Sequence, residues 1–170
     1  MRGRLECVIV ALALAMACHA DAWAQPIEPP LIEVAPTDAA MNAAIKEARR
    51  TLPIFRRIFD RRPRDVEAYW IKIAMPTYGG GHEYIWVYDL SWGAGTVTGK
   101  LANEPEHLPG LHLDSKVTVK QETIADWAYL KRGKLYGHFT TRVLAARMSE
   151  REAAEARAAF APQPVEPGLP

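Results

Sequence analysis

The serines and glycines of this sequence do not form the patterns of a nucleophilic or nucleotide-binding enzyme. After residue 24 the serines are Ser91, Ser115 and Ser149, and none lies in the Gly-x-Ser-x-Gly turn that presents a serine nucleophile. The Gly79-Gly80-Gly81 run does not precede a Lys-Ser or Lys-Thr pair, as a phosphate-binding loop requires. The sequence therefore argues against a serine hydrolase and against a phosphate-binding loop.

Histidines and carboxylates gather in the stretch 104–114, where His107, His112 and Asp114 are suitable ligands for a divalent metal. The spacing of five residues between the two histidines matches no recurrent helical or knuckle pattern. His82 and Glu83 are neighbours on an expected strand, so their side chains point to opposite faces. We therefore predict no metal site and no cofactor.

Carboxylates on or beside strands leave one enzymatic alternative open. Glycosidases need two carboxyl groups roughly 5–10 Å apart across a cleft. Glu83, Asp89, Glu122 and Asp126 lie where a pair of this kind is feasible. The alternative function is thus a hydrolase of an envelope polymer that uses paired carboxylates or a histidine-based metal site.

Aromatic residues are the most informative side chains. Tyr84, Trp86 and Tyr88 alternate along one side of an expected strand, and Ile85 and Val87 take the other side. Tyr and Trp suit recognition because each joins a broad apolar body to a polar tip, and they serve equally well as half-buried strand residues. The aromatic side is therefore a candidate binding surface.

Two further clusters carry candidate binding residues. Asp126 can accept backbone N–H bonds at a tight turn while the Trp127 indole closes one end of the core. Thr140 and Arg142 are expected to share a strand face, where Arg142 would pair with Asp126 or Glu83. The candidate binding residues are Trp86, Tyr88, Asp126, Trp127, Thr140 and Arg142.

The N-terminus has the order of charged, apolar and small residues that is typical of a secretory signal peptide. Arg2 and Arg4 precede an apolar run from Cys7 to Cys18, and Ala24 completes a cleavage motif before Gln25. The run is shorter than the ~20 residues of a membrane-spanning helix, which argues against an anchor. We predict an exported, periplasmic protein whose mature chain contains no cysteine. Lipoprotein processing at Cys18 is the alternative.

Prolines cluster on both sides of the expected domain. Residues 25–37 are predicted as a proline-rich linker and residues 161–170 as a proline-rich tail, because both lack apolar periodicity. The folded domain is then expected over residues 38–160. The formal net charge of the chain is only +1, which argues against nucleic acid as a partner.

The domain is predicted to open with a long helix capped by Thr37. Met41, Ile45, Ala48 and the apolar residues that follow recur at spacings of three and four, and Pro53 predicts a kink or a break. Basic residues crowd the stretch 46–64, which predicts either a solvated helix back or a patch that binds an anionic partner.

After Pro63 the apolar period changes to that of strands. Expected strands cover residues 69–75, 82–88, 95–101, 116–124, 126–130 and 135–143, with a turn at 131–134, and Gly99 and Gly137 are expected at bulges or bends. Ser149 and Glu152 form a capping box ahead of a closing helix that ends near Phe160. We therefore predict an α+β fold: a small curled antiparallel sheet of five or six strands with a long kinked N-terminal helix and a C-terminal helix.

The order of several motifs resembles the YegJ-like proteins, domain-of-unknown-function family 2314, over about residues 40–160. The more specific parts are Ile124-x-Asp126-Trp127 and Gly137-x-x-Thr140-x-Arg142. The resemblance implies a small exported α+β domain without an assigned activity. From the residues we predict a non-catalytic module that binds a protein or a cell-envelope component, with no membrane span in the mature chain.

Overall fold

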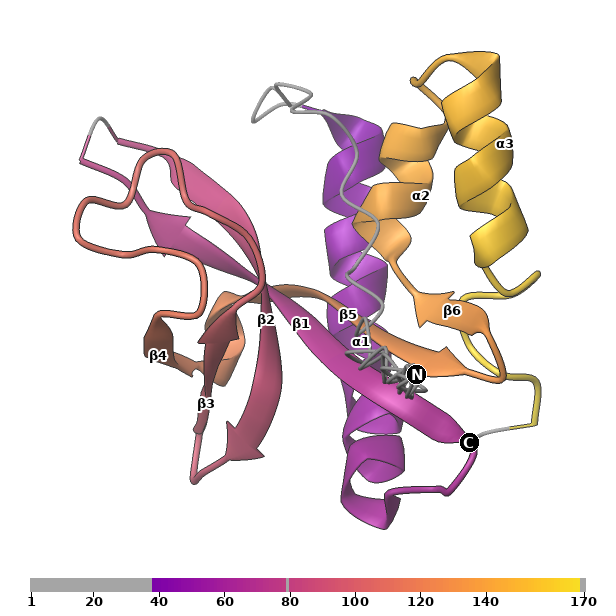
Figure 1. Ribbon diagram of the computed structural model, residues 1–170, viewed down its shortest axis with the longest axis horizontal. Coiled ribbons are helices and arrows are strands. Elements are labelled where there is room, and N and C mark those ends of the chain that lie inside the picture. Colours follow the sequence, from indigo (N-terminus) through magenta and orange to yellow (C-terminus); the bar gives the residue numbers. More distant parts are fainter. Residues whose placement is uncertain (1–37, 79, 169–170) are drawn as a thin grey trace, which may run out of the picture.

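The computed structural model describes residues 38–78 and 80–168, which form one open antiparallel sheet and three helices (Figure 1). The sheet has six strands in the order β4-β3-β2-β1-β5-β6, so the predicted α+β class is confirmed. The predicted signal peptide and linker, both cysteines and Thr37 lie outside the described residues. The elements are α1 (Ala39–Arg61), β1 (Val66–Pro76), β2 (His82–Trp92), β3 (Thr96–Leu101), β4 (Lys116–Lys120), the 3₁₀ helix η1 (Gln121–Thr123), β5 (Ile124–Lys131), β6 (Lys134–Gly137), α2 (Phe139–Ala145) and α3 (Glu150–Ala159).

Helix α1 begins because Asp38 caps it, accepting the backbone N–H of Met41 at 3.0 Å. It ends at Arg62, which has a left-handed φ of 46°. The predicted kink at Pro53 is not confirmed, since the helix runs unbroken from Ala39 to Arg61. None of the helices in the described part of the chain is long and apolar enough to cross a membrane.

Two of the basic residues placed on the back of α1 by its periodicity reach the sheet instead. The Nε of Arg49 donates to the carbonyl oxygen of Ile124 at 2.9 Å, and the guanidinium of Arg56 lies 4.6 Å from the centroid of the Trp92 ring. Arg50 pairs with Glu47 on the exposed side. Some basic residues of α1, Arg49 and Arg56, thus hold the helix to the sheet and are not free to form an anion-binding patch.

The central strand β1 is buried on both faces. Ile71 and Ile73 join Ile85 of β2 and Phe55 of α1 in a core that we call the helix-1 core. Trp70 on the opposite face joins a second core, which contains Trp86, Ala128, Leu135, Ala145, Ala156 and Phe160. Lys72 lies on that second face in the middle of the strand, only 7 % exposed.

The register of β5 on β1 shifts between Lys72 and Ile73, so that Asp126 pairs with Lys72 and Ile124 pairs with Ile73. Such a shift changes which side chains share a face. Ile124 and Trp127 therefore both belong to the helix-1 core. Asp126 lies across from Lys72 in the regular register that precedes the shift, and the shift brings Ile124 opposite Ile73.

The predicted strand over 135–143 is wrong beyond Gly137. Gly137 and His138 have φ values of 74° and 54°, and two successive left-handed residues turn the chain out of β6 into α2. Thr140 and Arg142 therefore lie on a helix and not on a shared strand face. The turn predicted at 131–134 is confirmed, because Arg132 and Gly133 connect β5 to β6 with φ values of 50° and 69°.

The segment expected as a free C-terminal tail packs on the domain over residues 161–168. The N–H of Ala161 donates to the carbonyl oxygen of Leu135 at 2.9 Å, and that of Gly137 donates to the carbonyl oxygen of Pro164 at 2.7 Å. Glu166 accepts from Lys131 at 2.8 Å. The segment thus covers the β6 edge of the sheet, which would otherwise expose its backbone groups.

Candidate functional site

The side chains of Trp127 and Tyr88, two of the predicted binding residues, have structural partners of their own. Trp127 is fully buried in the helix-1 core, where its Nε1 donates to the carbonyl oxygen of Ala48 at 3.0 Å and its ring stacks on Phe55. Tyr88 is half-buried and its hydroxyl donates to Asp114 in the loop between β3 and β4. Both side chains hold elements of the fold together.

The loop between β3 and β4 uses its histidines and carboxylates for its own structure. Glu83 accepts the backbone N–H groups of Glu106 and His107, each at 2.8 Å. Glu104 contacts the Nδ1 of His112 at 2.9 Å. Within the described residues, no group of three or more His, Cys, Asp or Glu side chains is arranged to hold a metal ion.

Asp126 joins β5 to the start of α2. Its carboxylate accepts the backbone N–H groups of Trp127 at 2.8 Å, Phe139 at 3.2 Å and Thr140 at 2.7 Å, and also the hydroxyl of Thr140 at 2.7 Å. The predicted role of Asp126 as an acceptor of backbone N–H bonds is confirmed. Because Asp126 is fully buried and bonded in this way, the hydrolase alternative gains no support from it.

Lys72, Asp126, His138, Thr140 and Thr141 form a buried polar cluster on the second face of the sheet. Burial raises the pKa of Asp126, and the bonds from Thr140 and the charge of Lys72 oppose that rise. Burial, as the largest cause, and the cations of Lys72 and Arg142 together lower the pKa of His138 to about 3. The imidazole is therefore neutral at physiological pH.

Trp86 covers this cluster and is itself fully buried, so the strand does not present an exposed aromatic surface at this position. Its ring centroid lies 4.7 Å from that of His138 and 4.8 Å from the Nζ of Lys72. Only Tyr84 of the predicted aromatic side is largely exposed, at 47 %.

Arg142 does not form the predicted pair with Asp126 or Glu83. Its Nε donates to the carbonyl oxygen of Gly137 at 2.9 Å, and its Nη2 donates to those of Leu135 and Ala161 at 3.3 and 2.9 Å. These carbonyls come from β6 and from the C-terminal segment, which Arg142 ties to α2. Burial lowers the pKa of Arg142, and the nearby Asp126 charge opposes that effect.

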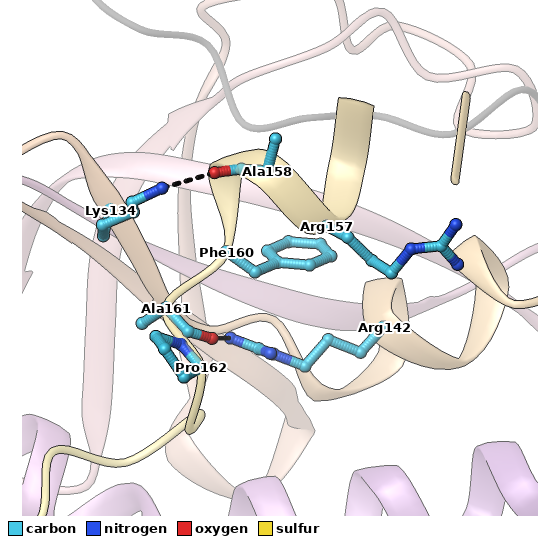
Figure 2. A pocket seen from close by; sticks show the side chains of 7 residues that line it. All are labelled: Lys134, Arg142, Arg157, Ala158, Phe160, Ala161 and Pro162. Atoms are coloured by element: carbon cyan, nitrogen blue, oxygen red, sulfur yellow. Dashed lines mark hydrogen bonds between the residues drawn. The ribbon is translucent and has the colours of Figure 1, made fainter. Parts of the chain in front are cut away.

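A pocket of about 400 Å³, which we call the basic pocket, opens beside Arg142 (Figure 2). The side chain of Arg142 runs beside the ring of Phe160 toward the carbonyl of Ala161, and its guanidinium lies 4.6 Å from the ring centroid. The Nζ of Lys134 donates to the carbonyl oxygen of Ala158 at 2.6 Å. The lining residues are Lys134, Arg142, Arg157, Ala158, Phe160, Ala161 and Pro162.

The basic pocket differs electrostatically from a second pocket of about 390 Å³ on β2, β3 and β4. In the second pocket Lys100 pairs with Asp89, which also lines it. The basic pocket has three cationic side chains and no carboxylate among its lining residues, and none of the three forms an ion pair within the part of the chain that the structure describes. Its chemistry is that of an anion-binding site with an apolar wall.

The structure brings together four of the six predicted binding residues, Trp86, Asp126, Thr140 and Arg142, around the start of α2. Sequence reasoning missed Lys72, His138 and the pocket residues Lys134, Arg157 and Phe160. Lys72 gave a usable signal, because a lysine between Ile71 and Ile73 interrupts an apolar strand. The pocket gave none, since its walls come from β6, α2, α3 and the C-terminal segment.

The fold and the site place this protein in a class of small α+β domains. Its antiparallel sheet is open, and it carries a buried polar cluster and a basic pocket. The chain belongs to the family DUF2314, described as an uncharacterized protein conserved in bacteria, whose profile matches residues 38–161. The sequence resemblance to this family is thereby confirmed.

Two curated relatives share sequence with the domain. The chain is 29% identical over 119 residues to the uncharacterized protein YegJ of Escherichia coli K12, covering 70% of this chain and 76% of that protein. It is 30% identical over 130 residues to a putative ankyrin repeat protein of Neisseria meningitidis serogroup B, covering 72% of this chain and 51% of that protein. The chain thus spans about half the length of the Neisseria protein. No solved structure matches the chain.

Proposed function

We propose that this protein is an exported, non-catalytic binding domain, and that it binds an anionic group of a protein or cell-envelope component in the basic pocket. The observation that carries the proposal is the set of three cations, Lys134, Arg142 and Arg157, around the ring of Phe160 without a carboxylate among the described lining residues. Charge-assisted hydrogen bonds to carboxylate or phosphate are the strongest polar contacts that such side chains make. The apolar wall favours a ligand whose anionic group is attached to an apolar body.

The pocket is organised before any ligand arrives. Arg142 is held by three backbone carbonyls, and Lys134 is held by the carbonyl of Ala158. A ligand that meets fixed side chains orders fewer groups when it binds, which favours affinity. Arg157 extends from the exposed side of α3 and supplies the third positive charge.

Calorimetric titration of benzoate into the purified full chain tests the binding site. Benzoate is a suitable probe because it joins one carboxylate to one apolar ring. We expect Arg157→Glu to weaken binding about tenfold, because it replaces an attractive charge with a repulsive one. Arg57→Glu, which makes the same charge change on exposed α1, should leave the affinity unchanged. Equal effects of the two substitutions would show that only the overall charge matters.

The export part of the proposal rests on the N-terminal pattern of Arg2, Arg4, the apolar run and Ala24. Expression of the full chain in a Gram-negative host, followed by fractionation and mass spectrometry of the N-terminus, tests it. We expect a periplasmic protein that starts at Gln25. A lipid-modified Cys18 would support the lipoprotein alternative, and an unprocessed cytoplasmic chain would contradict export.

A further inference from the structure

Two ring nitrogens, on fully buried rings that lie against each other, have no hydrogen-bond partner in the described residues. They are the Nε1 of Trp86 and the Nε2 of His138, and their rings are in contact at 4.7 Å. Buried polar groups are nearly always hydrogen-bonded, so an unpaired pair from two different elements requires an explanation. The other unpaired polar atoms of this kind belong to Tyr69, Trp92 and Tyr129 of the helix-1 core.

The Trp86 nitrogen is a hydrogen-bond donor, and the His138 Nε2 is one in the tautomer that carries its proton there. The indole Nε1 only donates. The Nδ1 of His138 lies 3.2 Å from the hydroxyl oxygen of Thr141, which can donate to it and so leave the proton of the neutral imidazole on Nε2. The Nζ of Lys72 lies 4.8 Å from the Trp86 ring centroid. The surroundings therefore favour an oxygen that accepts hydrogen bonds.

Phe160 separates these donors from the basic pocket. Its ring centroid lies 5.6 Å from that of His138, while the same side chain lines the pocket and contacts Arg142. The backbone of Phe160 is held by its N–H bond to Ala156 and by its bridge to Leu135. Phe160 is only 6 % exposed, and its side chain is the one that both lines the pocket and contacts the ring of His138.

We propose that Phe160 is a gate, and that behind it Trp86 and His138 form an inner subsite for a hydrogen-bond acceptor carried on the apolar part of the ligand. The anionic group stays outside at Arg142 and Arg157. The ligand class is thus an anion whose apolar body carries an oxygen acceptor at the end remote from the charge. This inference rests on the proposed function of the basic pocket and adds the chemistry of the ligand's buried end.

The test compares benzoate with 4-hydroxybenzoate, which adds one phenolic oxygen opposite the carboxylate. In calorimetry with the full chain we expect the hydroxyl to increase affinity at least fivefold. Trp86→Phe keeps an aromatic ring and removes the indole N–H, so it should abolish this difference between the two probes. Trp92→Phe removes an unpaired indole N–H from the other core and should retain the difference. Phe160→Leu should strengthen binding of 4-hydroxybenzoate by shortening the gate.

A measurement on the unmodified protein avoids dependence on how the variants fold. In ¹H–¹⁵N spectra 4-hydroxybenzoate should shift the indole resonance of Trp86 and the imidazole Nε2 resonance of His138, in proportion to occupancy. If benzoate binds at the arginines and the added hydroxyl changes neither affinity nor these resonances, the inner subsite is refuted and the proposed function stands. If neither probe binds, both are refuted.

Discussion

His138 is the residue in which conformation, burial and charge combine most strongly. It has a left-handed φ of 54°, is fully buried, and makes tilted ring contacts with Trp86 and Phe160. The cations of Lys72 and Arg142 act against its protonation. A backbone strain and a buried neutral imidazole at the same position are features that cluster at functional sites.

This environment predicts a pH dependence of stability. The pKa of His138 is about 3 in the folded protein and ~6.5 in the unfolded chain. Between these values the unfolded chain takes up a proton that the folded protein does not, so the free energy of unfolding falls as pH falls below ~6.5. The loss is roughly 2 kcal/mol at pH 5.

Urea denaturation at pH 7.5 and pH 5 measures this loss. His138→Asn should remove it, because asparagine tolerates the left-handed conformation and does not titrate in this range. His82→Asn, an exposed substitution, should behave as the wild type does. An equal decrease in stability for wild type and His138→Asn would contradict the assignment.

Gly137 is required for two separate reasons. Its φ is 74°, and a Cβ at this position would lie 2.1 Å from the carbonyl oxygen of Trp127. We expect Gly137→Ala to cost at least about 3 kcal/mol, because both the strain and the clash are incurred. Gly133→Ala has a similar φ of 69° with nothing within 4 Å, so it should cost only about 1 kcal/mol. If chemical denaturation gave the two variants similar losses of unfolding free energy, the clash of the new Cβ with Trp127 would have been relieved by a local shift.

At the scale of elements, the short helix α2 depends on contacts from outside itself. Seven residues are too few for a helix to be stable alone, and the two N–H groups at the start of α2 donate to Asp126 of β5. At the other end, Arg142 ties α2 to β6 and to the C-terminal segment. Helix α3 instead carries its own capping box at Ser149 and Glu152.

The contrast between the two helices is testable. Asp126→Asn should lower the free energy of unfolding by about 1–3 kcal/mol. Only one of the two terminal atoms of an amide can accept hydrogen bonds, and an amide does not offset the charge of Lys72. Hydrogen exchange should increase at the amides of Phe139 and Thr140. Ser149→Ala should cost about 1 kcal/mol and increase exchange only in α3. Unchanged exchange in α2 of Asp126→Asn would show that the carboxylate does not hold the helix.

At the scale of the whole molecule, sequence periodicity predicted most elements, because apolar spacing reports directly on a buried face. The stripe of α1, the alternation in β1 and β2 and the capping box of α3 are local patterns of this kind. The strand predicted over residues 135–143 is wrong beyond Gly137, because the left-handed conformation of His138 has no signature in the apolar pattern. The packed C-terminal segment was missed because proline-rich sequence lacks periodicity whether or not it packs.

The site was harder to predict than the fold. The sequence identified Asp126 and Arg142 as candidate binding residues. Their hydrogen bonds, however, go to backbone N–H and carbonyl groups, which sequence patterns do not report. The basic pocket joins residues that are separated in the chain, Arg142, Arg157 and Phe160 among them. Only the folded arrangement of β6, α2 and α3 makes these residues neighbours, as Figure 1 shows for the elements that carry them.

The packed C-terminal segment predicts an effect of truncation. Ending the chain at Ala161 removes the bond from Gly137 to Pro164, the Lys131–Glu166 ion pair and the packing of Val165 on the helix-1 core. We expect a loss of about 2 kcal/mol in urea denaturation. Ending the chain at Glu166 retains these contacts and should leave stability unchanged. If both truncations behave as the full chain does, the segment contributes nothing to the fold.

The most direct test of the central claim, that the basic pocket is the binding site, is a map of backbone amide shifts as benzoate is titrated into the full chain. We predict that the largest shifts fall at Lys134, Arg142 and residues 157–161, and that Arg157→Glu raises about tenfold the benzoate concentration needed to produce them. Shifts concentrated on the basic stretch 46–64 of α1, or on the loop between β3 and β4, would contradict the claim.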